Sequence, residues 1–388
     1  MKIAIFSDTF PPEVNGVANF TYLSANALAK KGHDVQVYTA SRISQRKLNE
    51  KIGKKFKIFT GFSLHSPIYF DTRVPLPTGI SFPHLLRFRP DIIHANTPFT
   101  SGWGAVMGAK ILRIPLVGTH HTFYDHYLKH AKIDFNLARK ATWKYTVSFY
   151  NFCDLVTVPS HSLAEEMKDH KLKKSVVVLP NFVNTQLFKP AGKLEKNNLK
   201  KQFKIKGNSI AYMGRLSYEK SIDQVLKAFK ITLQKTPDLK LMVIGDGPER
   251  ENLEKLARKL GVSKKIIFTG FLRGENLAKA LQANDIFVTA SKTETFCIAA
   301  LEAMSTGLPV IASNDKGITE IVKNNVNGYL VRPDDNKQMA NKISYLFANE
   351  KKRELFSKKS TKIAQTCSKE KVIEKLEKIY LKISRKKK

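Results

Sequence analysis

The chain has 388 residues, 42% of them hydrophobic and 10% aromatic, which is long enough for two folded domains that each bury a core. Its 66 basic and 33 acidic side chains give a net charge of +33, which predicts association with a polyanion or an anionic bilayer unless it reflects a compositional bias of the genome. The chain has no run of eighteen apolar residues and only three scattered cysteines, and its first residues become polar too soon for the pattern of a signal peptide. We therefore expect a cytoplasmic protein without a membrane span, disulfide framework or zinc site.

The excess of basic residues is unevenly distributed. Residues 1–188 carry 24 basic and 12 acidic side chains, and residues 207–350 carry 20 and 16. The short segment 189–206 carries 7 and 1, and residues 351–388 carry 15 and 4. The charge therefore gathers in the first half, in a central segment and in the C-terminal tail.

The first forty residues predict the opening of a doubly wound α/β domain. A short apolar run at Lys2–Asp8 is followed by a helical pattern, a Lys-Lys-Gly stop and a second strand. Asn15-Gly16-Val17 then lies at the carboxyl end of the first strand, where such sheets bind ligands. Gly16 lets a backbone N–H approach a phosphate, although a tight turn without a ligand also favours glycine.

Two further buried-strand patterns occupy residues 91–99 and 114–128, and both end in polar residues at the same edge of the sheet. The second leads into Thr119-His120-His121-Thr122. By pattern alone both histidines are ordinary loop residues.

Residues 127–154 mix basic and aromatic side chains. A basic helix with an aromatic face can lie in a membrane interface, and the alternative is that the aromatic side chains join the domain core. The candidate membrane or acceptor contacts are Lys129, Lys132, Arg139, Lys140, Trp143 and Lys144. A second basic stretch, residues 42–57, is expected to form a mobile loop of the same domain.

A polar, lysine-rich linker is expected at 189–206, and a second alternation of strands and helices follows it. Arg215 and Lys220 lie five residues apart after the first of these strands. This spacing lets a guanidinium fork and an ammonium group converge on a pyrophosphate. No Asp-x-Asp triplet occurs in the chain, so we expect no metal or other cofactor.

The segment SKTETFCIAALEAMSTGLPVIA, residues 291–312, contains two carboxylates eight residues apart. Glu294 and Glu302 share one helix face if a helix begins near Thr295. Free N–H groups at that helix N-terminus attract phosphate, and carboxylates accept hydrogen bonds from sugar hydroxyls. The pattern suggests a nucleotide-sugar site, and the alternative is a surface helix with two solvated glutamates.

Together these segments resemble the retaining GT-B glycosyltransferases of family 4. The matching motifs are the E-x7-E at Glu294 and Glu302 with its E-A-M-x-x-G-x-P-V-I-A continuation, GRLSYEK at Gly214–Lys220, PEVNGVA at Pro12–Ala18, the T-x-H-T loop at 119–122 and the P-N…F strand at 180–188. They keep the family order over nearly the whole chain.

The resemblance implies an α/β GT-B fold of two Rossmann-like domains facing each other across a cleft. We expect residues 1–188 to form the N-terminal acceptor-binding domain and residues 207–368 the C-terminal nucleotide-sugar-binding domain. Residues 369–388 are expected to form a helix and basic tail that cross back to the first domain.

The resemblance also assigns roles to residues. It implies catalytic roles for His121, Glu294, Arg215 and Lys220, and donor binding by Gly16, Arg215, Lys220, Glu294, Phe296, Cys297, Ile298 and Glu302. His120 is expected to be structural. Two positions depart from the family pattern, because Cys297 and Ser221 stand where glycine is usual. Cys297 narrows the space around the sugar and thereby puts the donor sugar in question.

The basic, aromatic segment after the T-x-H-T loop resembles the members of the family that glycosylate diacylglycerol. We therefore expect transfer of a hexose, foremost glucose from UDP-glucose, to a lipid such as diacylglycerol at the inner face of the cell membrane. A family 4 enzyme for another acceptor, such as phosphatidylinositol with GDP-mannose or a soluble sugar, is the first alternative. A basic nucleic-acid-binding protein is the second, although no nucleic-acid motif supports it.

Overall fold

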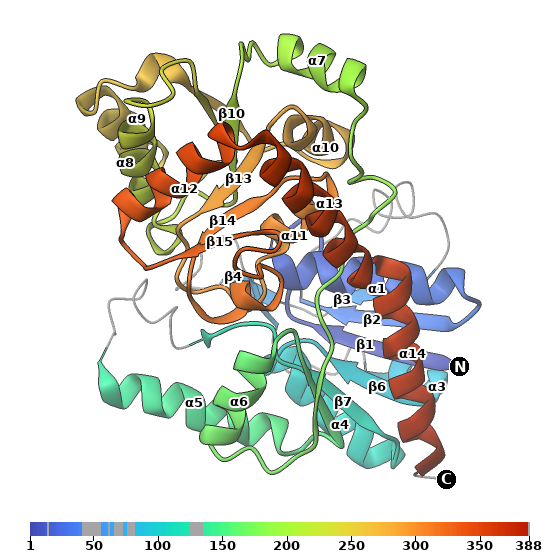
Figure 1. Ribbon diagram of the computed structural model, residues 1–388. Helices are drawn as coiled ribbons and strands as arrows, with labels where there is room; N and C mark the ends of the chain where they lie inside the picture. The colour runs from blue at the N-terminus through green and yellow to red at the C-terminus, as the bar shows by residue number, and fades with distance from the viewer. Residues whose placement is uncertain are drawn as a thin grey trace. The chain divides into compact units, whose positions relative to one another are not determined.

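The computed structural model describes residues 1–13, 15–40, 56–60, 63–65, 73–75, 82–124 and 135–386. These residues belong to two compact units, Met1–Asn181 with Glu370–Lys388 and Phe182–Lys369. Each unit contains a parallel β-sheet with helices on its faces, so the chain has the expected α/β GT-B class of fold (Figure 1).

The sheet of the first unit has seven parallel strands in the order β3-β2-β1-β6-β7-β8-β9. Their bounds are β1 (Lys2–Ser7), β2 (Asp34–Thr39), β3 (Lys57–Thr60), β6 (Ile92–Ala95), β7 (Leu116–Thr119), β8 (Leu155–Val158) and β9 (Val176–Val178). In register, Ile3 lies beside both Val35 and Ile92. A separate antiparallel pair is formed by β4 (Ser63–His65) and β5 (Arg73–Pro75).

Helices cover both faces of this sheet. They are α1 (Gly16–Lys30), α3 (Phe82–Phe88), α4 (Thr100–Leu112), α5 (Asn136–Tyr150), α6 (His161–Asp169) and α14 (Lys369–Lys386). Successive strand residues point to opposite faces, so both faces need apolar side chains. Phe6 and Ile93 join the core cluster with residues of α3 to α6, whereas the neighbouring His94 faces α14.

The C-terminal helix α14 contacts the first unit through a regular apolar face. Val372, Ile373, Leu376 and Tyr380 are buried at helical spacing. The Tyr380 hydroxyl lies 2.5 Å from Nδ1 of His94, whose Nε2 lies 2.6 Å from Oγ1 of Thr119. The last helix is thereby connected to the strand that leads into the His120–His121 loop (Figure 1).

The second unit has a sheet of six parallel strands in the order β12-β11-β10-β13-β14-β15. The strands are β10 (Ser209–Met213), β11 (Lys240–Ile244), β12 (Ile266–Gly270), β13 (Ile286–Thr289), β14 (Val310–Ser313) and β15 (Gly328–Val331). The helices are α7 (Lys193–Gln202), α8 (Ile222–Thr232), α9 (Arg250–Lys259), α10 (Gly274–Gln282), α11 (Ile298–Ser305), α12 (Asn336–Ala348) and α13 (Glu350–Thr366).

Two core clusters flank this second sheet. One contains Ala211 and Met242 together with residues of α7, α10 and α11. The other contains Ile210 and Leu241 together with residues of α8, α9 and α12. This alternation along β10 and β11 is what a sheet buried on both faces requires.

The segment 189–206 differs from the linker expected there. It contains α7, and Leu199, Phe203 and Ile205 of this segment contact the core of the second unit. The division between the units falls after Asn181 rather than after residue 188. A lysine-rich segment need not be a linker, because lysine is itself a good helix former.

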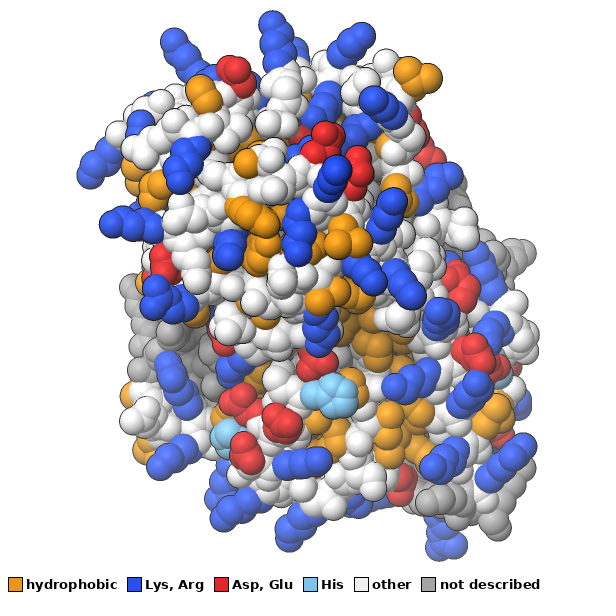
Figure 2. Space-filling model, viewed as in Figure 1, with side chains coloured by type: hydrophobic (Ala, Val, Ile, Leu, Met, Phe, Trp, Pro, Cys, Tyr) orange, Lys and Arg blue, Asp and Glu red, His pale blue; other side chains and the backbone are white. Residues whose placement is uncertain are grey.

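Basic side chains dominate the face of the molecule shown in Figure 2, where Lys and Arg greatly exceed Asp and Glu. None of the described helices is long and apolar enough to cross a membrane.

The Tyr380–His94 hydrogen bond leads to a stability prediction. We expect Tyr380→Phe to lower the free energy of unfolding by about 1–3 kcal/mol, because it leaves Nδ1 of the buried His94 without its partner. Lys378→Ala, which removes an exposed ion pair with Glu374, is the matched control and should leave the unfolding midpoint unchanged. Urea denaturation measures both, and equal midpoints for the two variants would contradict the role of this bond.

Candidate active site

Sheet topology brings the predicted donor residues of the second unit together. The chain builds outward from β10 through β11 and β12, then returns to add β13, β14 and β15 on the other side of β10. The loops that follow β10 and β13 therefore diverge, and such a switch point is where open α/β sheets bind ligands. Arg215 and Lys220 follow β10, and Glu294 to Ile298 follow β13.

An ion pair joins these two loops. Nζ of Lys220 lies 2.7 Å from Oε1 of Glu294, and the two side chains are only 23% and 19% exposed. Burial alone raises the pKa of Glu294, but the adjacent Lys220 charge and hydrogen bond outweigh burial and lower it below its usual value. Glu294 is therefore ionised at neutral pH.

Arg215 lies in the same loop as Lys220 but is exposed, and its guanidinium makes no hydrogen bond or ion pair with the described residues. Its backbone neighbours are fixed, because the N–H of Gly214 donates to Ile244 O at 3.0 Å and that of Leu216 to Asp246 O at 2.9 Å. The cation is thus held on a rigid loop and is available to an anion.

Backbone N–H groups lie in the second loop. Those of Phe296, Cys297 and Ile298 form no hydrogen bond with the described residues, and the Cys297 side chain does not cap α11. The Phe296 side chain itself is buried in the core. Unpaired N–H groups at a helix N-terminus attract an anion, and this region already contains Arg215 and Lys220.

Helix α11 begins at Ile298, three residues later than expected. Cys297 has a φ of 59° and stops the helix from extending back to Thr295. The prediction that Glu294 and Glu302 share one helix face is therefore wrong, since Glu294 lies in the loop and only Glu302 is helical.

The two departures from the family pattern both retain the backbone that glycine would adopt. Cys297 has a φ of 59° and Ser221 a φ of 50°. This left-handed conformation costs a side-chain-bearing residue roughly 1–2 kcal/mol. The loops therefore keep their turn geometry although the glycines are gone.

Glu302 makes no hydrogen bond or ion pair through its carboxylate with the described residues. Burial raises the pKa of Glu302 to about 8. A buried carboxyl without a partner gains from hydroxyl donors, which agrees with the ribose contact that the family resemblance implies. That contact stays a prediction.

Two glycines that sequence analysis missed support these loops. The N–H of Gly317 donates to Glu294 O at 3.0 Å, and a Cβ at Gly317 would lie 2.0 Å from Thr295 O. A Cβ at Gly245 would lie 1.9 Å from Gly214 O. Gly317 follows β14 and Gly245 follows β11, so no sequence motif joins them to the loops they support.

In the first unit the corresponding switch point lies between β1 and β6. Gly16 is exposed and begins α1, whose first turn is capped by the Asn15 side chain accepting from Ala18 N at 2.8 Å. Asp8, which sequence analysis also missed, is buried after β1 and accepts from Ser101 N at 2.9 Å. The loops at this edge are thus fixed by buried polar contacts.

His121 is a buried, neutral imidazole. Its Nε2 lies 3.3 Å from Oδ1 of Asn96, whose amide nitrogen donates to Thr21, so Nε2 carries the hydrogen. Burial, followed by the nearby His94 and His120, lowers the pKa of His121 to about 3. A role in holding charge would therefore be that of a hydrogen-bonding group and not of a cation.

His120 is buried among Tyr124, Trp143 and Tyr150, in agreement with a structural role. Burial lowers its pKa to about 3.

The candidate membrane residues separate into three groups. Lys140 and Lys144 are exposed on α5, and Arg139 is half-buried. Trp143 is only 5% exposed and stacks on His170 with ring centroids 4.2 Å apart, so its assignment to a membrane face is wrong. Trp143 lies on the side of α5 that packs into the core, together with Val147 and Tyr150.

Lys129 and Lys132 lie outside the described residues, as do residues 42–55 of the basic loop, whereas Lys57 begins β3.

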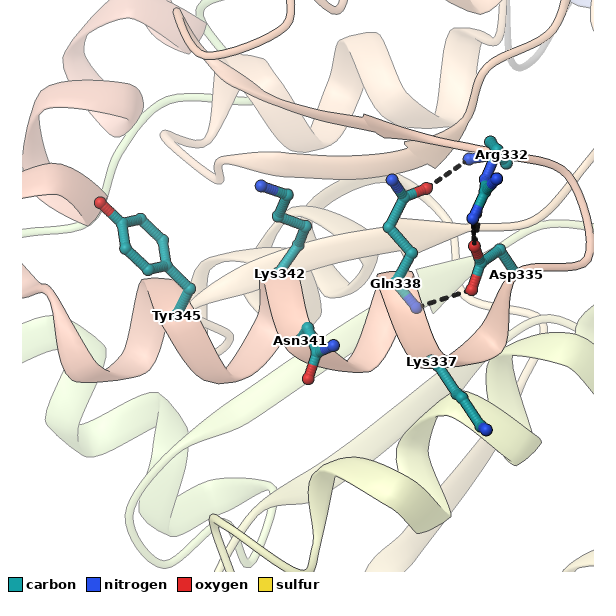
Figure 3. A pocket seen from close by; sticks show the side chains of 7 residues that line it. All are labelled: Arg332, Asp335, Lys337, Gln338, Asn341, Lys342 and Tyr345. Carbon is teal, nitrogen blue, oxygen red and sulfur yellow. Dashed lines mark hydrogen bonds and ion pairs between the residues drawn. The ribbon is translucent and has the colours of Figure 1, made fainter.

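A hollow of about 580 Å³ on the second unit contains none of the predicted residues (Figure 3). It runs along α12 beside Arg332, whose guanidinium lies 2.8 Å from Asp335. The Asp335 carboxylate is thus already paired, and the remaining side chains along α12 do not converge on a common point (Figure 3).

No three His, Cys, Asp or Glu side chains within the described ranges lie close enough to hold a metal ion.

A family model described as Glycosyltransferase Family 4 matches residues 14–187, and one described as Glycosyl transferases group 1 matches residues 195–363. The chain is 29% identical to an alpha-monoglucosyldiacylglycerol synthase of Streptococcus pneumoniae, over 85% of this chain and 75% of that protein. It is 30% identical to a GDP-mannose-dependent alpha-mannosyltransferase of Corynebacterium glutamicum, over 87% of this chain and 78% of that protein.

A glycosyltransferase of Methanocaldococcus jannaschii is 31% identical, over 86% of this chain and 85% of that protein. Among solved structures, HepE of Anabaena in complex with UDP superimposes with a TM-score of 0.80 at 20% identity, covering 98% of this chain and 99% of that one.

The close approach of Gly317 leads to a prediction. We expect Gly317→Ala to weaken binding of a nucleoside diphosphate by roughly tenfold or more, because the added Cβ must displace the Glu294–Phe296 backbone and small displacements of positioned groups are costly. Isothermal titration calorimetry with UDP and GDP measures the change. Gly192→Ala is the control, since a Cβ there would meet no atom within 4 Å. Unchanged affinity in Gly317→Ala would show that this contact does not shape the site.

Proposed function

Because the chain belongs to glycosyltransferase family 4, we propose that it transfers a hexose from a nucleoside-diphosphate sugar to a membrane lipid such as diacylglycerol. Family membership makes the chain a retaining glycosyltransferase that uses a nucleotide-sugar donor. The observation that carries the donor chemistry is the Lys220–Glu294 pair beside the exposed Arg215 and the unpaired N–H groups of residues 296–298.

These groups divide the work on the donor. Arg215, Lys220 and the N–H groups at the start of α11 bind the diphosphate and neutralise its charge as it leaves. Glu294 accepts hydrogen bonds from hydroxyls of the transferred sugar, and Glu302 from the ribose. Two fixed cations take the part that a divalent metal has in other transferases, so the reaction proceeds without added metal. The proposed contacts of Gly16 and His121 with the donor stay predictions.

The transfer needs no protein nucleophile. The acceptor hydroxyl oxygen bonds to the anomeric carbon on the face from which the diphosphate departs, while the bond from that carbon to the phosphate oxygen breaks. A β-phosphate oxygen receives the hydroxyl proton. The configuration is retained, and the contribution of the protein lies in positioning and electrostatic stabilisation. Because Glu294 is paired with Lys220 and ionised, it suits the role of a hydrogen-bond acceptor for sugar hydroxyls.

Two kinds of observation support a lipid acceptor. Proteins named alpha-monoglucosyldiacylglycerol synthase in Streptococcus pneumoniae and Acholeplasma laidlawii are 29% and 27% identical to this chain. The exposed lysines of α5 and the high net charge suit work at the anionic inner face of the cell membrane. The similarity to GDP-mannose-dependent alpha-mannosyltransferases supports mannose transfer as the second candidate.

A donor panel tests this proposal. UDP-glucose, UDP-galactose and GDP-mannose are each supplied, in EDTA, with vesicles of diacylglycerol, vesicles of phosphatidylinositol, or a soluble sugar. We expect transfer from UDP-glucose to diacylglycerol with the α-linkage retained. Transfer from GDP-mannose to phosphatidylinositol would establish the second candidate instead. Transfer to the soluble sugar alone would overturn the lipid acceptor, and a strict need for magnesium would overturn the role of the two cations.

The ion pair leads to a catalytic prediction. We expect Glu294→Gln and Lys220→Ala each to lower turnover by at least about a hundredfold, because preorganised charges that face a developing charge contribute roughly 3 kcal/mol. Initial rates of nucleoside diphosphate release measure the effect. Lys227→Ala, which removes an exposed ion pair with Asp223 on α8, is the control and should keep the wild-type rate. Wild-type rates in both site variants would remove this pair from the active site.

A further inference from the structure

The outward face of α4 is apolar, although a surface helix usually has polar residues there. Phe99, Trp103, Met107 and Ile111 are spaced four residues apart and are 43%, 37%, 47% and 56% exposed. Residues at this spacing lie on one side of a helix. The opposite side of α4, with Ala105 and Val106, contacts the core of the first unit, so the stripe lies on the side of the helix that faces away from the sheet.

Aromatic side chains at α5 extend the stripe sideways. The indole N–H of Trp103 donates to the Tyr145 hydroxyl at 3.0 Å, and the Phe99 and Tyr145 rings stack with centroids 6.4 Å apart. Phe152, just after α5, lies edge-on to Trp103 at 5.4 Å. Tyr145 and Phe152 are 41% and 45% exposed. We call the surface formed by Phe99, Trp103, Met107, Ile111, Tyr145 and Phe152 the α4–α5 patch.

The charged side chains of α4, of α5 and of the residues that flank them up to Phe152 are all basic, and the nearby Asp154 carboxylate accepts from Leu116 N at 2.8 Å. Residues 99–113 and 135–152 contain no Asp or Glu, whereas Lys110, Arg113, Lys140 and Lys144 are exposed. Nζ of Lys110 lies 4.5 Å from the centroid of the Phe152 ring, which places a cation directly on the patch. An apolar centre with a basic rim is complementary to a surface with an apolar interior and anionic head groups.

We propose that the α4–α5 patch docks the protein on an anionic lipid bilayer, with the α4 stripe entering the interface and the lysines contacting the head groups. The proposal rests on the proposed lipid acceptor and names the surface that brings the enzyme to it. Trp and Tyr suit this depth because each has an apolar ring and a polar tip. Each lysine or arginine near an anionic surface contributes about 1 kcal/mol to binding.

A second copy of the chain fits the same surface poorly. In a two-fold dimer the patch would face itself, so the basic rim would meet an identical basic rim. No acidic side chain of α4 or α5 could pair with those cations. A bilayer with anionic lipid neutralises the rim and covers the apolar centre at the same time.

The surface differs from the one that the sequence suggested. The aromatic residue predicted to lie on the membrane face, Trp143, is buried, and none of the predicted membrane contacts belongs to α4. Two exposed lysines of α5, Lys140 and Lys144, belong both to the membrane contacts predicted from the sequence and to the basic rim of the α4–α5 patch.

Vesicle flotation with two matched double variants tests the proposal. Met107→Gln with Ile111→Gln changes the α4 stripe at exposed positions, and Leu194→Gln with Leu355→Gln removes two exposed leucines of the second unit, which are 82% and 47% exposed. The vesicles contain phosphatidylglycerol with phosphatidylcholine, or phosphatidylcholine alone, at low and high salt.

We expect the wild type and the leucine variant to bind the anionic vesicles at low salt, with binding that falls steeply as salt rises. The α4 variant should lose at least about tenfold in affinity, which corresponds to about 1.4 kcal/mol. Equal binding of the α4 variant and the wild type would overturn the proposal, as would absence of wild-type binding. A wild-type dimer in solution that becomes monomeric in the α4 variant would assign the patch to a second copy instead.

These measurements can refute the proposed docking surface and the proposed lipid acceptor independently of each other. Transfer to detergent-dispersed diacylglycerol should be retained in the α4 variant, because the donor site lies in the other unit. Loss of vesicle binding in that variant, together with no lipid transfer by the wild type under any condition, would leave the docking surface intact and refute the acceptor. Normal transfer with unchanged vesicle binding would refute the surface alone.

Discussion

The Lys220–Glu294 ion pair is the interaction on which the proposed donor site depends. It joins the loop after β10 to the loop after β13, which diverge because the sheet reverses its direction of growth between these strands. At 2.7 Å and mostly buried, the pair keeps Glu294 ionised although burial opposes its charge. One contact thus fixes a carboxylate and a cation within the same small region.

The backbone conformation of the two loops that carry Lys220 and Glu294 is fixed by a few particular residues. Ser221 and Cys297 adopt the left-handed conformation without being glycine, and each holds the start of a helix that follows a site loop. Gly317 and Gly245 let neighbouring loops approach to distances that a Cβ would block. Local strain and close contacts of this kind are tolerated where surrounding structure determines the conformation, which is typical of binding sites.

The first unit has buried histidines and, on its outer side, exposed apolar side chains. His94 and His121 are buried and neutral, and they form hydrogen bonds that connect α14, β6 and the loop after β7. On the outer side of the same unit, apolar side chains of α4 remain exposed among lysines. The first arrangement fixes a loop, and the second is the surface that we propose for contact with a lipid interface.

The sequence determined the α/β class and the family, because strand and helix periodicity and short motifs such as GRLSYEK are local features of the chain. It also brought forward Arg215, Lys220, Glu294 and Glu302 as candidate donor residues, and their contacts with a donor stay predictions. Only the tertiary structure decided that Glu294 precedes α11, that residues 193–202 form a helix, and that Trp143 is buried while Met107 and Ile111 are exposed. These outcomes depend on which side of an element meets the sheet and on contacts between residues far apart, such as Gly317 with Thr295, which no local pattern records.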